Sequence, residues 1–110
     1  MKVNDIIEPL ELKIITGETL LDRQVKDGCV GDLLSVVMGK APEDSVWITV
    51  QSHINIIAVA SLVDVSCIIV SEGFSIDEDA INKAIEEDVI LLSSKKTSYE
   101  LCVELGKLNI

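Results

Sequence analysis

Three short apolar runs, each followed by polar residues and then by a helical segment, constrain the fold more than any other feature of the sequence. The runs are Val46–Val50, Cys67–Val70 and Val89–Leu92. Continuous apolar runs of this length are typical of strands that are covered on both faces. Strands joined by helices lie parallel, with right-handed crossovers. The sequence therefore predicts an α/β fold, a three-layer α/β/α sandwich with a mostly parallel central sheet.

The length and charge of the chain limit its organisation and its partners. With 110 residues, of which 48% are hydrophobic and 25% charged, the chain fits one globular domain over residues 1–110. Its formal net charge is −10. Nucleic acids and anionic membrane surfaces both bind clustered Lys and Arg, so we expect neither as a partner. No apolar stretch is long enough to predict a membrane span.

Cysteine usage indicates a reduced protein. Cys29, Cys67 and Cys102 are odd in number and have no CxxC spacing, and the N-terminal residues lack the apolar core of a signal peptide. We therefore expect a cytoplasmic protein with free thiols. Together with a single His, these cysteines provide no metal-ligand pair. A phosphate-binding glycine motif is also missing, so we expect neither a metal nor a cofactor.

Shorter elements are predicted before the alternating region. They are a helix over Asp5–Glu8 capped by Asn4, a strand over Leu12–Thr16, and a helix over Leu33–Met38 capped by Asp32 and stopped by Gly39. Between the strand and the second helix, residues 20–28 predict only a turn and a short extended segment.

Two capping boxes predict the starts of two surface helices. In Ser75–Glu78 and Thr97–Glu100, a Ser or Thr is followed three residues later by Glu. Each of the two side chains can then accept a hydrogen bond from a backbone N–H that the helix leaves free. The expected apolar stripes are Ala80, Ile81, Ala84 and Ile85 in the first helix, and Leu101, Cys102, Leu105 and Leu108 in the second.

The segment His53–Val63, which we expect Ser52 to cap, predicts a helix that is apolar almost all round. A helix without a polar face needs cover on more than one side. One sheet covers about half of such a helix, and we expect a second subunit to cover part of the rest. The sequence thus predicts a homodimer or larger assembly, with the interface candidates Ile54, Ile57, Ala58, Ser61 and Leu62.

Polar side chains follow each of the three predicted parallel strands. In open parallel sheets, ligands bind outside the carboxyl ends of the strands, beside helix N-termini. The hydroxyl, amide and carboxylate groups there predict a small crevice that tolerates an anion, although the same residue types also serve as caps and turn formers. The candidate ligand-binding residues are Thr49, Gln51, Ser52, His53, Asn55, Ser71, Glu72, Gly73, Ser93 and Ser94.

Two residue types that occur once each have alternative roles. The only imidazole, His53, would act as a general base if a carboxylate such as Glu72 positioned it. A His in the first turn of a helix also makes structural or interface hydrogen bonds. The only guanidinium, Arg23, can hold a loop through an ion pair with a carboxylate elsewhere in the fold, or it can bind an anionic ligand. Arg23 is therefore a further candidate for ligand binding.

Several segments resemble the DRTGG domain family. They are Thr16-Gly17-Glu18, Leu21-Asp22-Arg23 with Gly28, Asp32–Ser35, Trp47–His53 with Asn55, Cys67–Gly73, and the late strand that ends in Leu91-Leu92-Ser93. The likeness covers almost the whole chain. It departs at the motif that gives the family its name, where Lys26 and Asp27 stand in place of Thr and the first Gly.

The family is similar to the N-terminal domain of HPr kinase/phosphorylase, so the resemblance implies a three-layer α/β/α sandwich without a kinase active site. DRTGG domains also occur beside CBS pairs in regulated pyrophosphatases and next to phosphotransacetylase-type domains. The resemblance therefore implies a non-enzymatic regulatory or assembly module, which we expect to self-associate and to sense a small anionic metabolite or nucleotide. Two alternatives stay open: a domain that docks onto a separately encoded kinase or hydrolase, and a small enzyme that uses His53.

Overall fold

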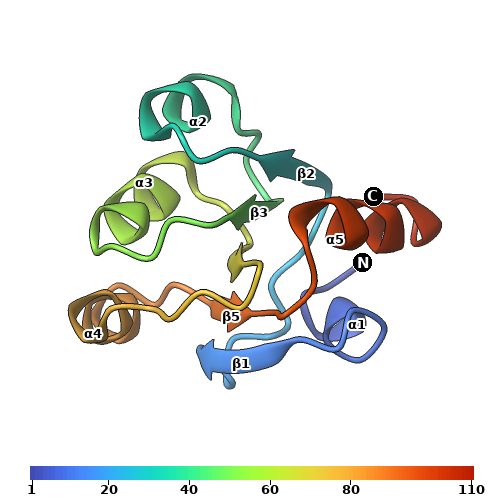
Figure 1. The fold of residues 1–110 in the computed structure, drawn as a ribbon, viewed down its shortest axis with the longest axis horizontal. Helices are drawn as coiled ribbons and strands as arrows, with labels where there is room; N and C mark the ends of the chain where they lie inside the picture. Colours follow the sequence, from blue (N-terminus) through green and yellow to red (C-terminus); the bar gives the residue numbers. More distant parts are fainter.

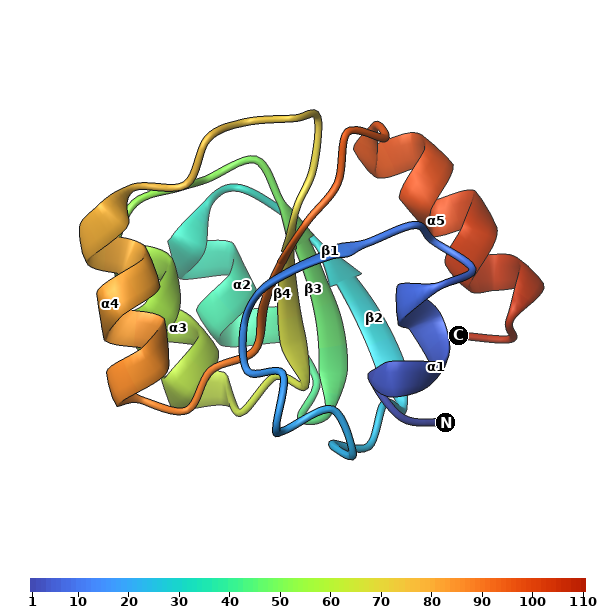
Figure 2. The same ribbon diagram turned by 90° about the horizontal axis from the view of Figure 1, so that it is seen from below.

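A five-stranded sheet with helices on both faces makes up the computed structural model, which describes residues 1–110 (Figure 1; Figure 2). The strands are β1 (Lys13–Thr16), β2 (Asp27–Val30), β3 (Ser45–Thr49), β4 (Cys67–Val70) and β5 (Leu91–Ser93). The helices are α1 (Asn4–Ile7), α2 (Leu34–Lys40), α3 (Asn55–Val63), α4 (Glu78–Glu86) and α5 (Ser98–Lys107). The predicted three-layer α/β/α sandwich is confirmed.

The sheet is mostly parallel, as predicted. Its order is β1-β5-β4-β3-β2, in which β2 to β5 pair in parallel and β1 alone pairs antiparallel, with β5. The sequence predicted no strand at β2, which pairs with β3 from Asp27 opposite Ser45 to Val30 opposite Ile48. Three of the four residues of β2 are exposed, so this edge strand has no apolar run that would reveal it.

Side chains of the central strands alternate between two cores. Ile48 and Ile69 pack with α1 and α5 on one face, whereas Trp47 and Ile68 pack with α2, α3 and α4 on the other. Each of these four side chains is at most 1% exposed, and burial on both faces explains the unbroken apolar runs. The indole of Trp47 keeps a hydrogen-bond partner, because its Nε1 donates to the backbone oxygen of Gly31 over 3.0 Å.

The environment of α3 differs from the one expected. This helix lies between α2 and α4 on one face of the sheet (Figure 1), so the two neighbouring helices and the sheet together cover its apolar sides. Ile57 is fully buried within the protomer, and its prediction as an interface residue is therefore wrong. The other four candidates, Ile54, Ala58, Ser61 and Leu62, are exposed. The apolar character of α3 thus needs no second subunit to explain it.

Helix starts are the least accurate part of the prediction. The N-caps of α1 to α4 are Val3, Leu33, Ile54 and Asp77, and none of these four side chains makes a capping hydrogen bond. The predicted caps Asn4, Asp32, Ser52 and Ser75 are therefore wrong. Only Thr97 forms its predicted capping box, with Glu100, at the start of α5. Candidate capping residues are also good hydrogen-bond partners for loops and strand ends, and several are used there instead.

The helix surfaces require three further corrections. Gly39 lies inside α2 and does not stop it. Cys102 is exposed on α5, so it is not part of the buried stripe, and Ile85 of α4 is 62% exposed. Of the remaining stripe residues, Ala80, Ala84, Leu101 and Leu105 are buried as expected, and Ile81 and Leu108 are half-buried. None of the five helices combines the length and the apolar character that a membrane crossing requires.

β1 is fastened to β5 through one side chain and one close backbone approach. Thr16 Oγ1 donates to the backbone oxygen of Val89 over 2.8 Å and accepts from the N–H of Leu91 over 3.1 Å. Gly17 follows with φ 87°, and a Cβ at this residue would lie 3.0 Å from Cα of Ile90. This contact requires glycine, and it holds the carboxyl end of β1 against the amino end of β5.

Candidate functional site

The loop after β3 is held by the carboxylate of Asp32, which the sequence had suggested as a helix cap. Asp32 Oδ1 accepts from Thr49 Oγ1 over 2.9 Å and from the N–H of Val50 over 2.8 Å. The side-chain amide of Gln51 donates to the backbone oxygen of Asp32 over 3.1 Å. Thr49 and Gln51, both predicted to bind ligand, are thus engaged in holding this loop.

His53 pairs with Asp77, and the predicted partnership with Glu72 is wrong. His53 Nδ1 lies 2.9 Å from Asp77 Oδ2, and the N–H of Asp77 donates to the backbone oxygen of Ser52 over 3.1 Å. The His53 side chain is 70% exposed. These contacts tie the start of α3 to the start of α4, the structural role that the sequence left open for His53. Asn55, the first residue of α3, is exposed.

The loops that follow β4 and β5 are bonded to each other. Glu72 and Gly73 both have a left-handed backbone, with φ of 65° and 71°, and their N–H groups donate to the backbone oxygens of Lys96 and Ser94 over 2.8 and 2.9 Å. The carboxylate of Glu72 accepts from the N–H of Ser98 over 3.2 Å. Ser71 Oγ lies 2.7 Å from Ser98 Oγ. Glu72 is therefore bonded to the start of α5 and Ser71 is buried beneath it.

Beside these bonded loops lies a pocket of about 340 Å³, the lysine pocket. Three segments build it: the start of β1, the loop after β4 and the loop after β5. The antiparallel register places Lys13 directly opposite Ser93, which brings the first of these segments to the carboxyl end of β5. The lining residues are Glu11, Lys13, Gly73, Phe74, Ser93, Ser94, Lys95 and Lys96.

The lysine pocket contains most of the basic side chains that form no ion pair within the chain. Five of the nine Lys and Arg side chains form ion pairs within the chain. Four do not, and three of those four line this pocket: Lys13, Lys95 and Lys96, whereas Lys40 lies at the end of α2. Glu11 is the one acidic residue in the lining.

The carboxylate of Glu100, in the first turn of α5, already accepts a hydrogen bond within that turn. The hydrogen bond from the N–H of Thr97 holds the pKa of Glu100 below its usual value, and Lys96 lowers the same pKa to a smaller extent. Lys96 therefore acts on Glu100 only through space, without a direct ion pair.

The structure does not bring all the predicted ligand-binding residues together in one crevice. Gly73, Ser93 and Ser94 line the lysine pocket, whereas the other candidates lie in the bonded loops or on α3. Lys95 and Lys96 were not among the predicted ligand-binding residues, although they directly follow two candidate serines at the end of β5. Lys13 and Glu11 had no sequence signal, because only the pairing of β1 with β5 brings them there.

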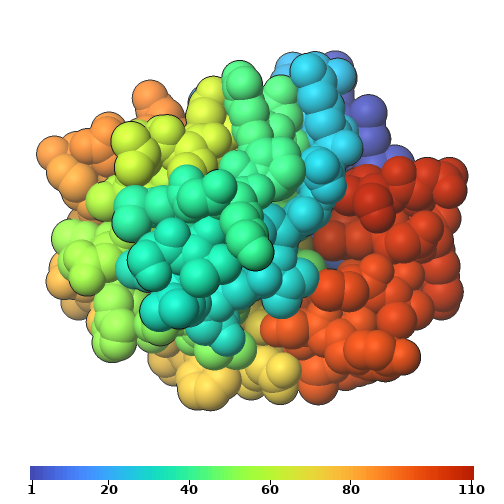
Figure 3. Space-filling view, turned by 90° about the horizontal axis from the view of Figure 1, so that it is seen from above, coloured from blue at the N-terminus to red at the C-terminus, as the bar shows by residue number.

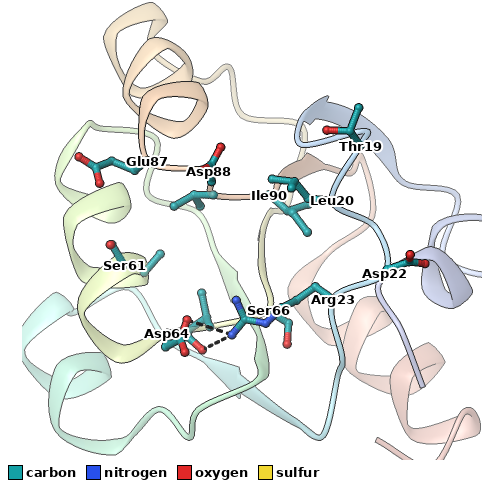
Figure 4. A pocket seen from close by; sticks show the side chains of 13 residues that line it. Thr19, Leu20, Asp22, Arg23, Ser61, Asp64, Ser66, Glu87, Asp88 and Ile90 are labelled. Atoms are coloured by element: carbon teal, nitrogen blue, oxygen red, sulfur yellow. Dashed lines mark hydrogen bonds and ion pairs between the residues drawn. The ribbon is translucent and has the colours of Figure 1, made fainter.

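Arg23 lies at the opposite end of the sheet, near the amino ends of β3 and β4 (Figure 4). Its Nη2 donates to Asp44 Oδ1 over 2.9 Å and to Oδ1 of Asp64 over 3.0 Å. Burial alone would lower the pKa of Arg23, but the hydrogen bonds to Asp44 and Asp64 outweigh it and raise that pKa. The ion pair with a distant carboxylate is thus the role that the structure shows for Arg23.

The pocket beside Arg23 has a volume of about 360 Å³ and an acidic lining, which includes Asp22, Asp64, Glu87 and Asp88. Four carboxylates around one guanidinium disfavour an anionic ligand. Of the two pockets, the lysine pocket therefore has the lining charge that suits an anion better.

Together, the fold and the lysine pocket define a three-layer α/β/α domain with a cationic pocket at the carboxyl ends of its strands. No protein-family model and no curated protein sequence matches the chain. Among solved structures, it is similar to the CBS and DRTGG domains of the regulatory region of Clostridium perfringens pyrophosphatase, complexed with the activator diadenosine tetraphosphate. The TM-score is 0.76 at 15% sequence identity.

This similarity covers 94% of the present chain and 45% of the other. The chain thus spans less than half the length of the regulatory region that it resembles. Its fold is DRTGG-like, in agreement with the resemblance noted in the sequence.

Proposed function

We propose that this chain is a regulatory module that binds an anionic nucleotide in the lysine pocket and performs no chemistry of its own. The observation that carries the proposal is the grouping of Lys13, Lys95 and Lys96, three of the four basic side chains without an ion pair, around one pocket. In a chain with a net charge of −10, carboxylates are plentiful, so lysines left without one are available to an external anion.

The other groups of the lysine pocket suit the rest of a nucleotide. Phe74 is the only Phe of the chain and is 55% exposed at the pocket. Stacking of a base on an aromatic ring contributes about 1–3 kcal/mol. The hydroxyl of Ser93 can donate to a phosphate or a ribose. The similar structure from Clostridium perfringens is a regulatory region complexed with a nucleotide activator, which supports this class of ligand.

Binding, rather than turnover, is the chemistry that these side chains offer. The lysine pocket presents cations, hydroxyls, an aromatic ring and one carboxylate, that of Glu11, and groups of these kinds suit the binding of a ligand. His53 is bonded to Asp77 on the pair of loops that leads into α3 and α4. An enzyme that uses His53 with Glu72 therefore has no support in the geometry.

Isothermal titration calorimetry with ATP, AMP, diadenosine tetraphosphate and adenosine tests the proposal. We expect the three phosphorylated compounds to bind and uncharged adenosine to bind more weakly or not at all. Because part of the attraction is ionic, affinity should fall as salt shortens the Debye length below its value of about 10 Å at 0.1 M. No binding by any of the phosphorylated compounds would overturn the proposal.

Two lysine variants locate the site. Lys95→Ala with Lys96→Ala should weaken nucleotide binding by about tenfold or more, a loss of about 1.4 kcal/mol. Lys40→Ala is the matched control, because Lys40 is the other basic residue without an ion pair and lies on α2. Equal weakening by Lys40→Ala would show that net charge, and not the lysine pocket, governs binding.

The regulatory action is proposed to involve association. A ligand shifts an assembly equilibrium only through its different affinities for the two states, so the stoichiometry should be measured with and without nucleotide. On α3, the exposed residues Ala58, Ser61 and Leu62 line a shallow pocket with Lys83 of α4 and with Glu87, the C-cap of α4. This surface of α3 remains a predicted interface. Its exposed area is smaller than the area expected for a helix that is apolar on all sides.

A further inference from the structure

Glu11 is the one carboxylate in the lining of the lysine pocket, and the binding of phosphate by the lysines gives it no role. Its side chain forms no hydrogen bond and no ion pair, although three lysines line the same pocket. A carboxylate among cations weakens the attraction of a pocket for an anion. On the basis of the nucleotide site proposed above, we propose that the Glu11 carboxylate accepts hydrogen bonds from the two vicinal hydroxyls of a ribose, so that the pocket selects ribonucleotides.

The backbone holds Glu11 at the pocket on a fixed turn between α1 and β1. Its N–H donates to the backbone oxygen of Glu8 over 3.1 Å, and the N–H of Leu12 donates to the backbone oxygen of Ile7 over 2.9 Å. Glu11 itself is exposed and has a left-handed backbone, with φ 54°. Its neighbours Leu10 and Leu12 are buried in the core. The two leucines therefore fix the position from which the Glu11 side chain lines the pocket.

The other walls of the lysine pocket are bonded to each other. The N–H groups of Glu72 and Gly73 donate to the backbone oxygens of Lys96 and Ser94. At the lower edge of Figure 3, the loop after β4 (yellow) accordingly lies against the loop after β5 and the start of α5 (orange and red). Fixed walls lose little conformational freedom when a ligand binds, so this pocket can distinguish ligands by the positions of their donors and charges.

Ribose hydroxyls suit Glu11 better than a metal ion does. Mg²⁺ is bound by one or two carboxylates together with substrate phosphates, so a carboxylate beside a phosphate site raises that alternative. Three lysines in the same pocket disfavour a divalent cation. Hydroxyls have no charge, and an ionised carboxylate, which can only accept, has two oxygens for two hydroxyl donors. In dinucleotide-binding folds, an acidic side chain binds the ribose in this way.

Each part of a ribonucleotide then has a partner in the lysine pocket: the phosphate has the lysines, the base has Phe74 and the ribose has Glu11. The pocket volume of about 340 Å³ lies within the range of small-molecule sites, about 300–1,000 Å³. Glu11 also disfavours anions without hydroxyls, such as inorganic triphosphate, because they meet its charge and offer it no donor. The carboxylate thus makes the pocket selective among anions.

Calorimetry with two nucleotides that differ only in their ribose hydroxyls tests the proposal. AMP and 2′,3′-dideoxyadenosine 5′-monophosphate have the same base and the same phosphate, and EDTA in the buffer removes divalent cations. The wild-type protein should bind AMP about tenfold or more tightly than the dideoxy compound. Glu11→Gln keeps the size of the side chain and removes its charge, so the preference for AMP should fall to about threefold or less.

Glu8→Gln is the matched control, because it removes the same charge from an exposed residue at the end of α1 that does not line the pocket. It should leave the preference for AMP unchanged. Inorganic triphosphate should respond with the opposite sign: Glu11→Gln should bind it several-fold more tightly than wild type does, since a repulsive charge is removed. Circular dichroism should show that both variants remain folded.

The outcomes separate the role of Glu11 from the nucleotide site itself. Equal affinities of the wild-type protein for AMP and the dideoxy compound would overturn the role of Glu11 and leave the nucleotide site standing. A preference for AMP that persists in Glu11→Gln, or that Glu8→Gln reduces equally, would also overturn it. If neither compound binds the wild-type protein, both the nucleotide site and the role of Glu11 are overturned.

Discussion

Arg23 and Asp44 form a part-buried ion pair that fastens the connection between β1 and β2 to the turn before β3. Arg23 Nη2 lies 2.9 Å and Nε 3.3 Å from Asp44 Oδ1. The same Nη2 donates to the backbone oxygen of Asp64 over 2.8 Å, at the C-cap of α3, where Asp64 has a left-handed backbone. One guanidinium thus joins three segments that are distant in sequence.

Arg23→Lys is expected to destabilise the protein although it preserves the charge. A lysine ammonium cannot reproduce the planar fork that serves Asp44 and Asp64 together. We expect the melting temperature to fall by several degrees in circular dichroism. Lys107→Gln is the control, because the Lys107–Glu104 pair lies on the surface of α5 and exposed pairs contribute little. Equal melting temperatures for wild type and Arg23→Lys would contradict the proposed anchoring role.

The Asp44 carboxylate should make stability depend on pH in the acidic range. The hydrogen bond from Arg23 lowers the pKa of Asp44, and this effect outweighs the opposing effect of burial. A carboxyl whose pKa is lower in the folded state stabilises the protein above its unfolded pKa of about 3.9, and this stability is lost as the pH falls through the folded pKa. Asp44→Asn should therefore be less stable than wild type at neutral pH, and the difference should shrink below about pH 4. Urea unfolding at a series of pH values measures this difference in stability. A difference that does not change with pH would show that ionisation of Asp44 is not involved.

The two predicted capping boxes provide a matched pair of substitutions. Thr97→Ala removes an observed cap, in which Thr97 Oγ1 accepts from the N–H of Glu100 over 3.1 Å. It should reduce the free energy of unfolding by about 1 kcal/mol. Ser75→Ala changes a residue that is exposed and makes no capping hydrogen bond, so its effect should stay within about 0.5 kcal/mol. A larger loss at Ser75 than at Thr97 in chemical denaturation would reverse this assignment.

Strands buried on both faces were predictable because their chemistry is local. The runs around Trp47, Ile68 and Leu91 must be apolar at every position to face two cores, and that requirement is visible in a single sequence. β2 has no such requirement, since it is an edge strand with three exposed residues. Caps were predicted poorly because Asp32 and Ser75 have the right chemistry for a cap, while their neighbours in space decide whether it is used.

The sequence by itself determined the layered architecture and the polar residues Ser93 and Ser94 at the end of β5, because apolar periodicity and strand-end chemistry depend on neighbours along the chain. Only the tertiary structure decided that Lys13 joins them, that His53 pairs with Asp77, and that α3 is enclosed by α2 and α4. These relationships depend on which segments become neighbours in space. That choice follows from the packing of the whole sheet, and no local pattern of residues encodes it.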